Sequence, residues 1–195
     1  KDVIMEKLQA GTLTEEAIDD VILRNWPRAE KIALKDIKMR TFIAQETGRD
    51  KMVSSVYDIT YGVVSEKDNL VVIDDSIVRG TTLRTSLLRI LGRTNPKRII
   101  VASTAPQIRY PDCYGIDMAK MGDLAAFRAA IALLKETKQE NIIDDVYDRA
   151  RAMVDRPLAE QENVVEDIYK PFTAQQVSDK IAELLTPTDI NAEVK

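Results

Sequence analysis

Hydrophobic residues recur at helical spacing in five parts of the chain. Apolar positions three and four residues apart predict amphipathic helices, whose ends are marked by capping residues, glycine or proline. The last of them has the clearest start, because Thr173 and Gln176 match a capping box, and Pro187 stops it. We expect Gly92 to end the second helix as its C′ residue. The five helices are predicted over residues 15–26, 83–91, 124–134, 142–153 and 174–185.

Continuous apolar runs between these helices predict buried strands. Leu70–Ile73 is followed at once by two aspartates, which is typical of a strand that is buried on both faces. A second run, Arg98–Ser103, comes directly after the predicted helix, as a parallel strand, helix, strand unit requires. Two shorter strands, within residues 41–43 and 53–64, flank a polar loop. The pattern therefore predicts a parallel α/β architecture.

The same pattern divides the chain into three parts. We expect a connecting segment with a helix at 1–38, an α/β domain at 39–154, and a C-terminal arm, helix and tail at 155–195. Lys1 stands inside a charged helical pattern rather than at an initiating methionine, and we expect the chain to be a piece of a longer protein.

Composition excludes several classes of chemistry. The 195 residues contain no histidine and one cysteine, Cys113, so the chain by itself cannot assemble a Ser/His/Asp relay, a histidine-ligated zinc site or a four-cysteine iron–sulfur site. A net charge of −4 does not favour nucleic acid as a partner. The longest apolar stretch, Ala129–Leu134, is far shorter than the ~20 residues of a membrane helix. We expect a cytoplasmic protein with no membrane partner.

The residues between the first strand and its helix carry the chemistry. Asp74 and Asp75 end the strand, and the turn to the helix contains Ser76, Arg79, Gly80, Thr81 and Thr82. Backbone N–H groups and the positive end of a helix dipole meet at such a junction, and the hydroxyl groups add donors, which together favour a phosphate. The carboxylates can accept hydrogen bonds from sugar hydroxyls or lie near Mg²⁺. A phosphorylated ribose is therefore the predicted ligand.

The residues of this turn, like Cys113 and the acidic residues further along, also have purely structural interpretations. Asp75 or Ser76 alone would be an ordinary helix cap, and Arg79 either adds charge to the site or faces solvent. Cys113 is expected to be a packing residue. The acidic residues of 140–148 are expected to form a solvated helix face. Capping alone accounts poorly for an acid pair, a glycine and a threonine pair within nine residues of one buried strand.

Val71–Thr82 closely resembles the phosphoribosyl pyrophosphate motif of the glutamine amidophosphoribosyltransferases, whose C-terminal domain is a type I phosphoribosyltransferase. Two further blocks resemble this family in the same order: Arg40–Ile43, and the segment from Ala105 to Met118. The resemblance covers roughly residues 40–125. It implies a parallel sheet with helices on both faces, here with a helical C-terminal extension.

The resemblance also implies a reaction, in which phosphoribosyl pyrophosphate and ammonia from glutamine give 5-phosphoribosylamine in the first step of purine synthesis. Asp74 and Asp75 would be catalytic, contacting the ribose hydroxyls and Mg²⁺ that arrives with the substrate. The 5-phosphate would be bound by Ser76, Ile77, Val78, Arg79, Gly80, Thr81 and Thr82. A flexible loop would close over the substrate through Arg40, Thr41, Arg49 and Lys51.

Several features of this family are missing or altered in this chain. Residues 54–58 lack the basic residues expected after the flexible loop, which leaves the pyrophosphate contacts open. The ammonia would come from an N-terminal glutaminase domain, which these residues do not contain. Some members hold an iron–sulfur cluster, but a single cysteine displaced from the ligand position implies none here. Purine nucleotide inhibitors and a homo-oligomer are the further partners that the resemblance implies.

Two other functions fit the same motif. One is a regulatory domain that binds phosphoribosyl pyrophosphate or a nucleotide without turning it over, which the altered loop permits. The other is a phosphoribosyltransferase for a nucleobase, which would need a base-binding platform; Trp26 lies far from the motif in sequence.

Overall fold

The computed structural model describes residues 2–24, 29, 32–35, 57–112 and 120–195. The chain forms two compact units, Lys1–Lys31 and Ile32–Lys195. The predicted loop residues Arg40, Thr41, Arg49 and Lys51, the strand expected at 41–43, and Cys113 lie outside the described residues. The three-part division at 38/39 and 154/155 stays a prediction.

The first unit contains two short helices, α1 (Asp2–Gln9) and α2 (Glu15–Arg24). The predicted start of α2 is confirmed, because Thr14 Oγ1 accepts a hydrogen bond from the N–H of Ala17 at 3.1 Å. Two acidic residues in its first turn, Glu15 and Glu16, lie where the helix dipole favours negative charge.

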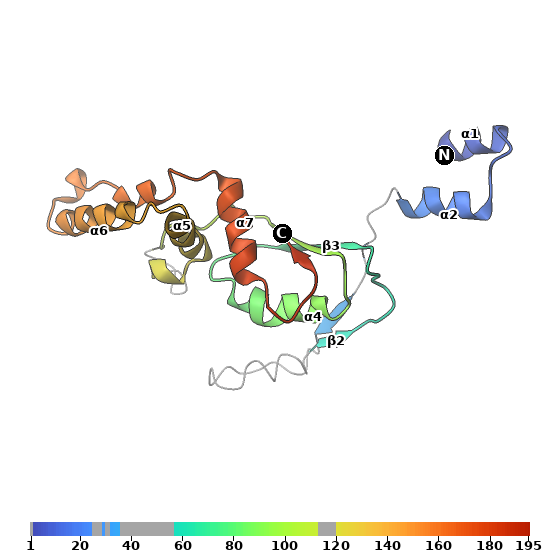
Figure 1. Cartoon of the computed structure of the whole chain (residues 1–195), viewed down its shortest axis with the longest axis horizontal. Coiled ribbons are helices and arrows are strands. Elements are labelled where there is room, and N and C mark those ends of the chain that lie inside the picture. The colour runs from blue at the N-terminus through green and yellow to red at the C-terminus, as the bar shows by residue number, and fades with distance from the viewer. Residues whose placement is uncertain (1, 25–28, 30–31, 36–56, 113–119) are drawn as a thin grey trace. The chain divides into compact units, whose positions relative to one another are not determined.

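The second unit is built on a three-stranded parallel sheet in the order β3–β4–β5 (Figure 1). The strands are β3 (Asn69–Asp74), β4 (Arg98–Ser103) and β5 (Glu193–Val194). Two further strands, β1 (Ala33–Lys35) and β2 (Tyr57–Ile59), pair antiparallel with each other. The predicted α/β class with a parallel sheet is confirmed.

The connection from β3 to β4 is helical, as predicted. A π-helical turn, η1 (Leu83–Leu87), leads directly into α4 (Leu88–Gly92). The register pairs Leu70 with Ile99 and Asp74 with Ser103, so the two strands end side by side. The connection therefore sets the carboxyl ends of β3 and β4 next to each other at one edge of the sheet.

Burial of β3 differs from the expectation drawn from its sequence. Leu70 is buried, but Val71 is 63% exposed and Ile73 74% exposed, so the expectation of burial on both faces is wrong for this strand. Ile99, the partner of Leu70 on β4, is fully buried. Alternate side chains of a strand point to opposite faces, and the core packs against the face that carries Leu70 and Ile99.

The end of α4 also differs from the prediction. Gly92 is the last residue of the helix, and Arg93 after it keeps a right-handed helical conformation, so Gly92 is not a C′ residue. The left-handed conformation occurs three residues later, at Asn95 with φ 52°. A Cβ atom on Gly92 would lie 2.9 Å from Cβ of Ile190. Close packing, rather than helix termination, accounts for this glycine.

A helical extension follows the sheet and packs mainly through two of its helices. Helix α5 (Ala125–Glu136) lies against α7 (Ala174–Leu185), and both contribute fully buried side chains to the core, among them Leu134 and Val177. The predicted capping box of Thr173 and Gln176 is present at the start of α7. The remaining elements are η3 (Met121–Asp123), α6 (Asn141–Met153), η4 (Leu158–Glu160) and η5 (Val164–Ile168).

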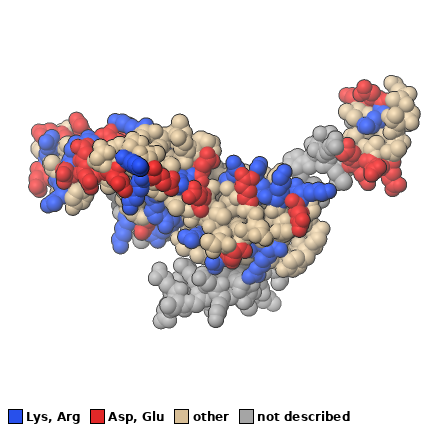
Figure 2. Space-filling view, viewed as in Figure 1, with Lys and Arg blue, Asp and Glu red and all other residues tan. Residues whose placement is uncertain are grey.

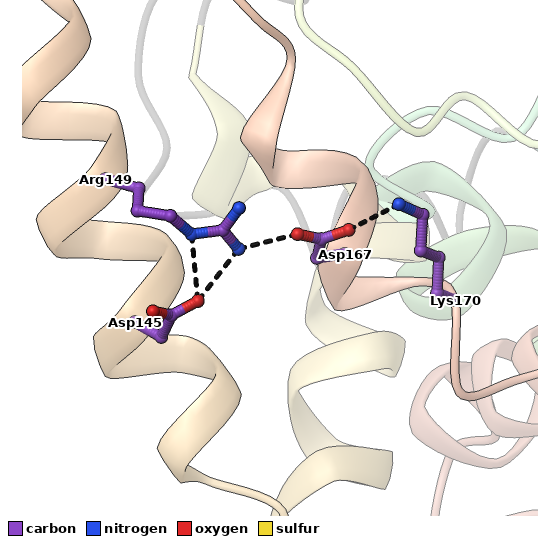
Figure 3. A network of polar contacts seen from close by, with 4 residues as sticks. All are labelled: Asp145, Arg149, Asp167 and Lys170. Atoms are coloured by element: carbon purple, nitrogen blue, oxygen red, sulfur yellow. Dashed lines mark hydrogen bonds and ion pairs between the residues drawn. The ribbon is translucent and has the colours of Figure 1, made fainter.

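A network of charged side chains joins α6 to the segment after it (Figure 3). Arg149 donates to Asp145 one turn earlier and to Asp167 of η5 at 2.6 Å, and Lys170 contacts the other oxygen of Asp167 at 2.6 Å. Hydrogen bonds from Lys170 and Arg149 lower the pKa of Asp167 below its usual range. Figure 2 shows acidic and basic side chains intermingled over this part of the unit, and the predicted solvated acidic face of α6 is confirmed.

None of the helices in the described part of the chain is both long and apolar enough to cross a membrane.

Candidate phosphate-binding site

The loop between β3 and its helix lies at the carboxyl edge of the sheet. We call residues 75–80 the phosphate loop. The helix begins at Thr81. Gly80 before it has φ +70°, a left-handed conformation that favours glycine. Ligands of parallel α/β sheets bind outside the carboxyl ends of the strands, so the phosphate loop lies where the fold class places a site.

The residues after β4 fix the main chain of the two aspartates. The N–H of Thr104 donates to the carbonyl of Asp74, and the N–H of Ala105 donates to that of Asp75, both at 2.9 Å. The hydroxyl of Thr104 donates to the carbonyl of Asp75 as well, at 3.1 Å. The acid pair is therefore held by hydrogen bonds to the neighbouring chain segment.

The two carboxylates take part in local hydrogen bonds through one oxygen each. Asp74 Oδ1 accepts from the N–H of Asp75 at 3.0 Å, and Asp75 Oδ1 accepts from the N–H of Ser76 at 2.6 Å. Asp75 is exposed and Asp74 half-buried. The second oxygen of each carboxylate is not used in these two bonds, and it is the atom that could accept from a sugar hydroxyl or bind a cation.

Thr81 and Thr82 are exposed at the start of the helical stretch. The first N–H groups of a helix have no carbonyl one turn earlier to donate to, and they carry the positive end of the helix dipole. The side chain of Thr82 makes no capping hydrogen bond to the helix that follows. Main-chain N–H groups and two hydroxyls at this end of the helix are an arrangement suited to an oxyanion.

Arg79 is directed towards an acidic side chain. Its guanidinium lies 3.6 Å from Asp123, and both side chains are less than half exposed. Sequence reasoning left open whether Arg79 adds charge to the site or faces solvent; in the structure it pairs with Asp123. Its role in binding a phosphate, like that of the other residues of the loop, stays a prediction.

Helix α5 contacts the main chain of the phosphate loop from behind. The N–H of Ala125 donates to the carbonyl of Val78 at 2.7 Å, and the guanidinium of Arg128 donates to the carbonyl of Arg79 at 2.9 Å. These bonds occupy carbonyl oxygens, which would repel an anion. The carbonyls of Val78 and Arg79 are thereby already hydrogen-bonded to α5.

The space around Gly80 gives a second reason for a glycine. A Cβ atom at this position would lie 2.7 Å from Cδ2 of Leu185, the last residue of α7. The left-handed backbone conformation of Gly80 is the first reason. The structure adds the packing of Leu185, whose contact no local pattern could have indicated because it comes from more than a hundred residues further along the chain.

A cavity of about 500 Å³ lies between the phosphate loop, β4 and α7. Ile77 and Leu83 line it from the loop and η1, Val101 from β4, and Ile181 from α7. The acid pair and the threonine pair do not line it. The cavity therefore adjoins the loop through Ile77 and reaches the end of β4 at Ser103, without including the acid pair or the threonine pair.

No protein cluster in the described residues has the three or more acidic, cysteine or histidine side chains needed to hold a metal by itself. Mg²⁺ binds to proteins through one or two carboxylates while keeping waters or substrate oxygens as its other ligands. The pair of exposed Asp75 and half-buried Asp74 fits that kind of shared site. It does not fit a resident metal held by protein ligands alone.

Curated relatives match part of this chain. It is 39% identical over 119 residues to the amidophosphoribosyltransferase of Pasteurella multocida, a match that covers 57% of this chain and 23% of the relative. The matches to the enzymes of the same name from Haemophilus influenzae and Escherichia coli are 42% identical over 90 residues and 43% over 58 residues. The matched part of the chain is similar to enzymes named amidophosphoribosyltransferase. The predicted resemblance is thereby confirmed.

The extent of the similarity limits what it says about the whole protein. The Haemophilus influenzae match covers 45% of this chain and 17% of the relative, and the Escherichia coli match 30% and 11%. The chain thus spans less than a quarter of the length of the curated amidophosphoribosyltransferases that it matches. No family model matches the chain.

Proposed function

We propose that this chain contains the part of an amidophosphoribosyltransferase that binds phosphoribosyl pyrophosphate. The observation that carries the proposal is the juxtaposition, at one carboxyl edge of a parallel sheet, of an acid pair and a helix start with two exposed threonines. The similarity to enzymes named amidophosphoribosyltransferase supports the same ligand.

In this proposal the two ends of the loop bind different parts of the substrate. Ser76 to Thr82 contact the 5-phosphate through main-chain N–H groups and hydroxyls, and the ribose hydroxyls donate to Asp74 and Asp75. Bound Mg²⁺ would offset the charge of the pyrophosphate, with Asp74 and Asp75 as its protein contacts. The bond from ribose C1 to the pyrophosphate oxygen breaks and pyrophosphate leaves with the electron pair of that bond. The lone pair of ammonia forms the new C–N bond at C1, and the ammonium group so formed loses one proton to solvent to give the amine.

The acid pair would act electrostatically. Positive charge develops on the ribose ring as the pyrophosphate departs, and a fixed carboxylate close to the ring stabilises that charge without having to reorganise. Thr104 and Ala105 fix the main chain of both aspartates, so the negative charge is placed before the ligand arrives. Removal of one such group costs on the order of 100-fold in rate. The ammonia would be supplied by a glutaminase domain outside these residues.

The proposal is tested by calorimetric titration of the chain with phosphoribosyl pyrophosphate and Mg²⁺. We expect saturable binding by the wild-type chain and its loss in Asp74→Asn/Asp75→Asn, with circular dichroism showing that the variant is folded. Arg84→Gln, at an exposed position after the loop, is the control and should bind normally. Equal binding by the wild type and the acid-pair variant would place the ligand elsewhere. Binding without ammonia-dependent turnover in the longer protein would favour a regulatory role.

A further inference from the structure

Besides the hydrogen bond from Ala125 to Val78, one side chain of α5 and one of α7 contact the phosphate loop, and neither side chain belongs to the family motif. Leu185 ends α7 and packs on the Cα of Gly80, and Arg128 of α5 donates to the carbonyl of Arg79. Gly80 and Arg79 are neighbours, so the contacts from the two helices fall on consecutive residues of the loop. We propose that Leu185 and Arg128 are positioning residues that set the geometry of the phosphate-binding main chain. This inference rests on the proposed function.

Leu185 is fixed independently of the loop. It is 3% exposed, and the helix that carries it begins with a complete capping box. Near its start, α7 is joined to the segment after β4, because Gln107 Nε2 donates to the carbonyl of Ala174 and contacts the hydroxyl of Ser178, both at 2.7 Å. The helix therefore has its own attachment to the sheet side of the unit.

The cavity that adjoins the loop makes the contact at Leu185 important. Along the middle of α7, Ser178, Ile181 and Ala182 line the cavity. Between the attachment at Gln107 and the contact at Gly80, α7 and β4 are thus separated by open space. Shortening Leu185 would enlarge this space, and few neighbouring atoms could close in to support Gly80 from behind.

Loss of this support would act on binding through the main-chain N–H groups. Their directions at Gly80 and Thr81 depend on the left-handed conformation of Gly80, with φ +70°. Binding through several N–H groups that must point at one phosphate depends on their exact positions. In an aligned catalytic site, misplacement by about 1 Å can lower the reaction rate on the order of 100-fold. A partial loosening is expected to weaken phosphate binding by about tenfold.

The test measures binding of ribose 5-phosphate by calorimetry in the 195-residue chain. We expect Leu185→Ala to raise the Kd about tenfold and Leu185→Met, which conserves volume, to stay near the wild type. Arg128→Gln, at an exposed position, should fold even if Leu185→Ala does not, and should also raise the Kd. Leu134→Ala is the matched control, because Leu134 is fully buried on α5 and the same atoms are removed.

Each outcome separates positioning from simple stabilisation. All measurements are made where urea titration shows more than about 99% of each variant folded, so that a lower free energy of unfolding does not by itself change the Kd. Unchanged affinity in Leu185→Ala and Arg128→Gln, with a wild-type chain that binds, would overturn the positioning role. An equal rise in Leu134→Ala would do the same. A wild-type chain that binds neither ribose 5-phosphate nor phosphoribosyl pyrophosphate would instead refute the proposed function, and this inference with it.

Discussion

Four glycines of the structure separate two reasons why a glycine can be required. Gly80 has a left-handed backbone conformation, and a neighbouring side chain occupies the space that a Cβ atom would need. Gly62 also has a left-handed backbone conformation, with φ +83°, but the space for a Cβ atom is open. Gly92 has only the close neighbour, Ile190, and Gly122 has neither feature. Alanine substitution at each position therefore forms a complete comparison of backbone conformation and packing.

The two contributions have different sizes. Placing alanine in the left-handed region costs about 1–2 kcal/mol, and forcing an extra methyl group into a packed contact costs about 1–3 kcal/mol. Gly80→Ala should therefore destabilise the fold by about 2–5 kcal/mol and Gly62→Ala by about 1–2 kcal/mol. Gly92→Ala should lose the packing term of about 1–3 kcal/mol but regain up to about 1 kcal/mol of it, because alanine is a better helix former than glycine. Gly122→Ala should stay within about 0.5 kcal/mol of the wild type.

Urea unfolding followed by circular dichroism measures all four variants, and a second substitution isolates the contact at Gly80. In Gly80→Ala/Leu185→Ala the new methyl group occupies space that the shortened leucine has left. The loss should therefore be smaller than the sum of the two single losses, by about 1–3 kcal/mol. A Gly80→Ala variant no less stable than Gly62→Ala, or additive losses in the double variant, would refute the packing of Leu185 on Gly80.

Four further outcomes follow from particular side chains. The pKa of Asp167 is lowered by its cationic partners, so its stabilising contribution is present above its ordinary value of 3.8 and is lost as pH falls through the lower folded value. Asp167→Asn lacks this contribution. When the pH is lowered from about 6 to about 2, the range in which carboxylates titrate, its free energy of unfolding should therefore fall less than that of the wild type. Tyr169→Phe removes a buried hydroxyl that donates to a main-chain carbonyl at 2.7 Å and should cost about 1 kcal/mol in urea titration. Burial also raises the pKa of Tyr169, so its absorbance should not change while the exposed tyrosines ionise. Ile99→Ala should cost about 2–5 kcal/mol, whereas Ile73→Ala, on the exposed face of the sheet, should cost less than about 1 kcal/mol; equal losses would contradict one-sided burial of β3.

Local sequence was sufficient for the main helices and for the main chain of the candidate site, but it indicated neither β1 nor β5. The capping box of Thr173 and Gln176 depends on residues three apart, and the strand, loop and helix from Leu70 onward depend on one continuous segment. Interactions between residues so close in sequence are set mostly by backbone geometry, which periodicity and turn residues report directly. The acid pair and the helix start could therefore be placed at one edge of the sheet before the fold was known.

Tertiary structure decided the contacts that join distant segments. The packing of Leu185 on Gly80, the pairing of Arg79 with Asp123 and the close approach of Ile190 to Gly92 all connect residues that no local pattern relates. The same holds for burial: Val71 and Ile73 are as apolar as Leu70, yet they are exposed because the core packs on the other face of β3. A run of apolar residues shows that a strand can be buried, whereas which of its faces is covered depends on where the rest of the chain packs.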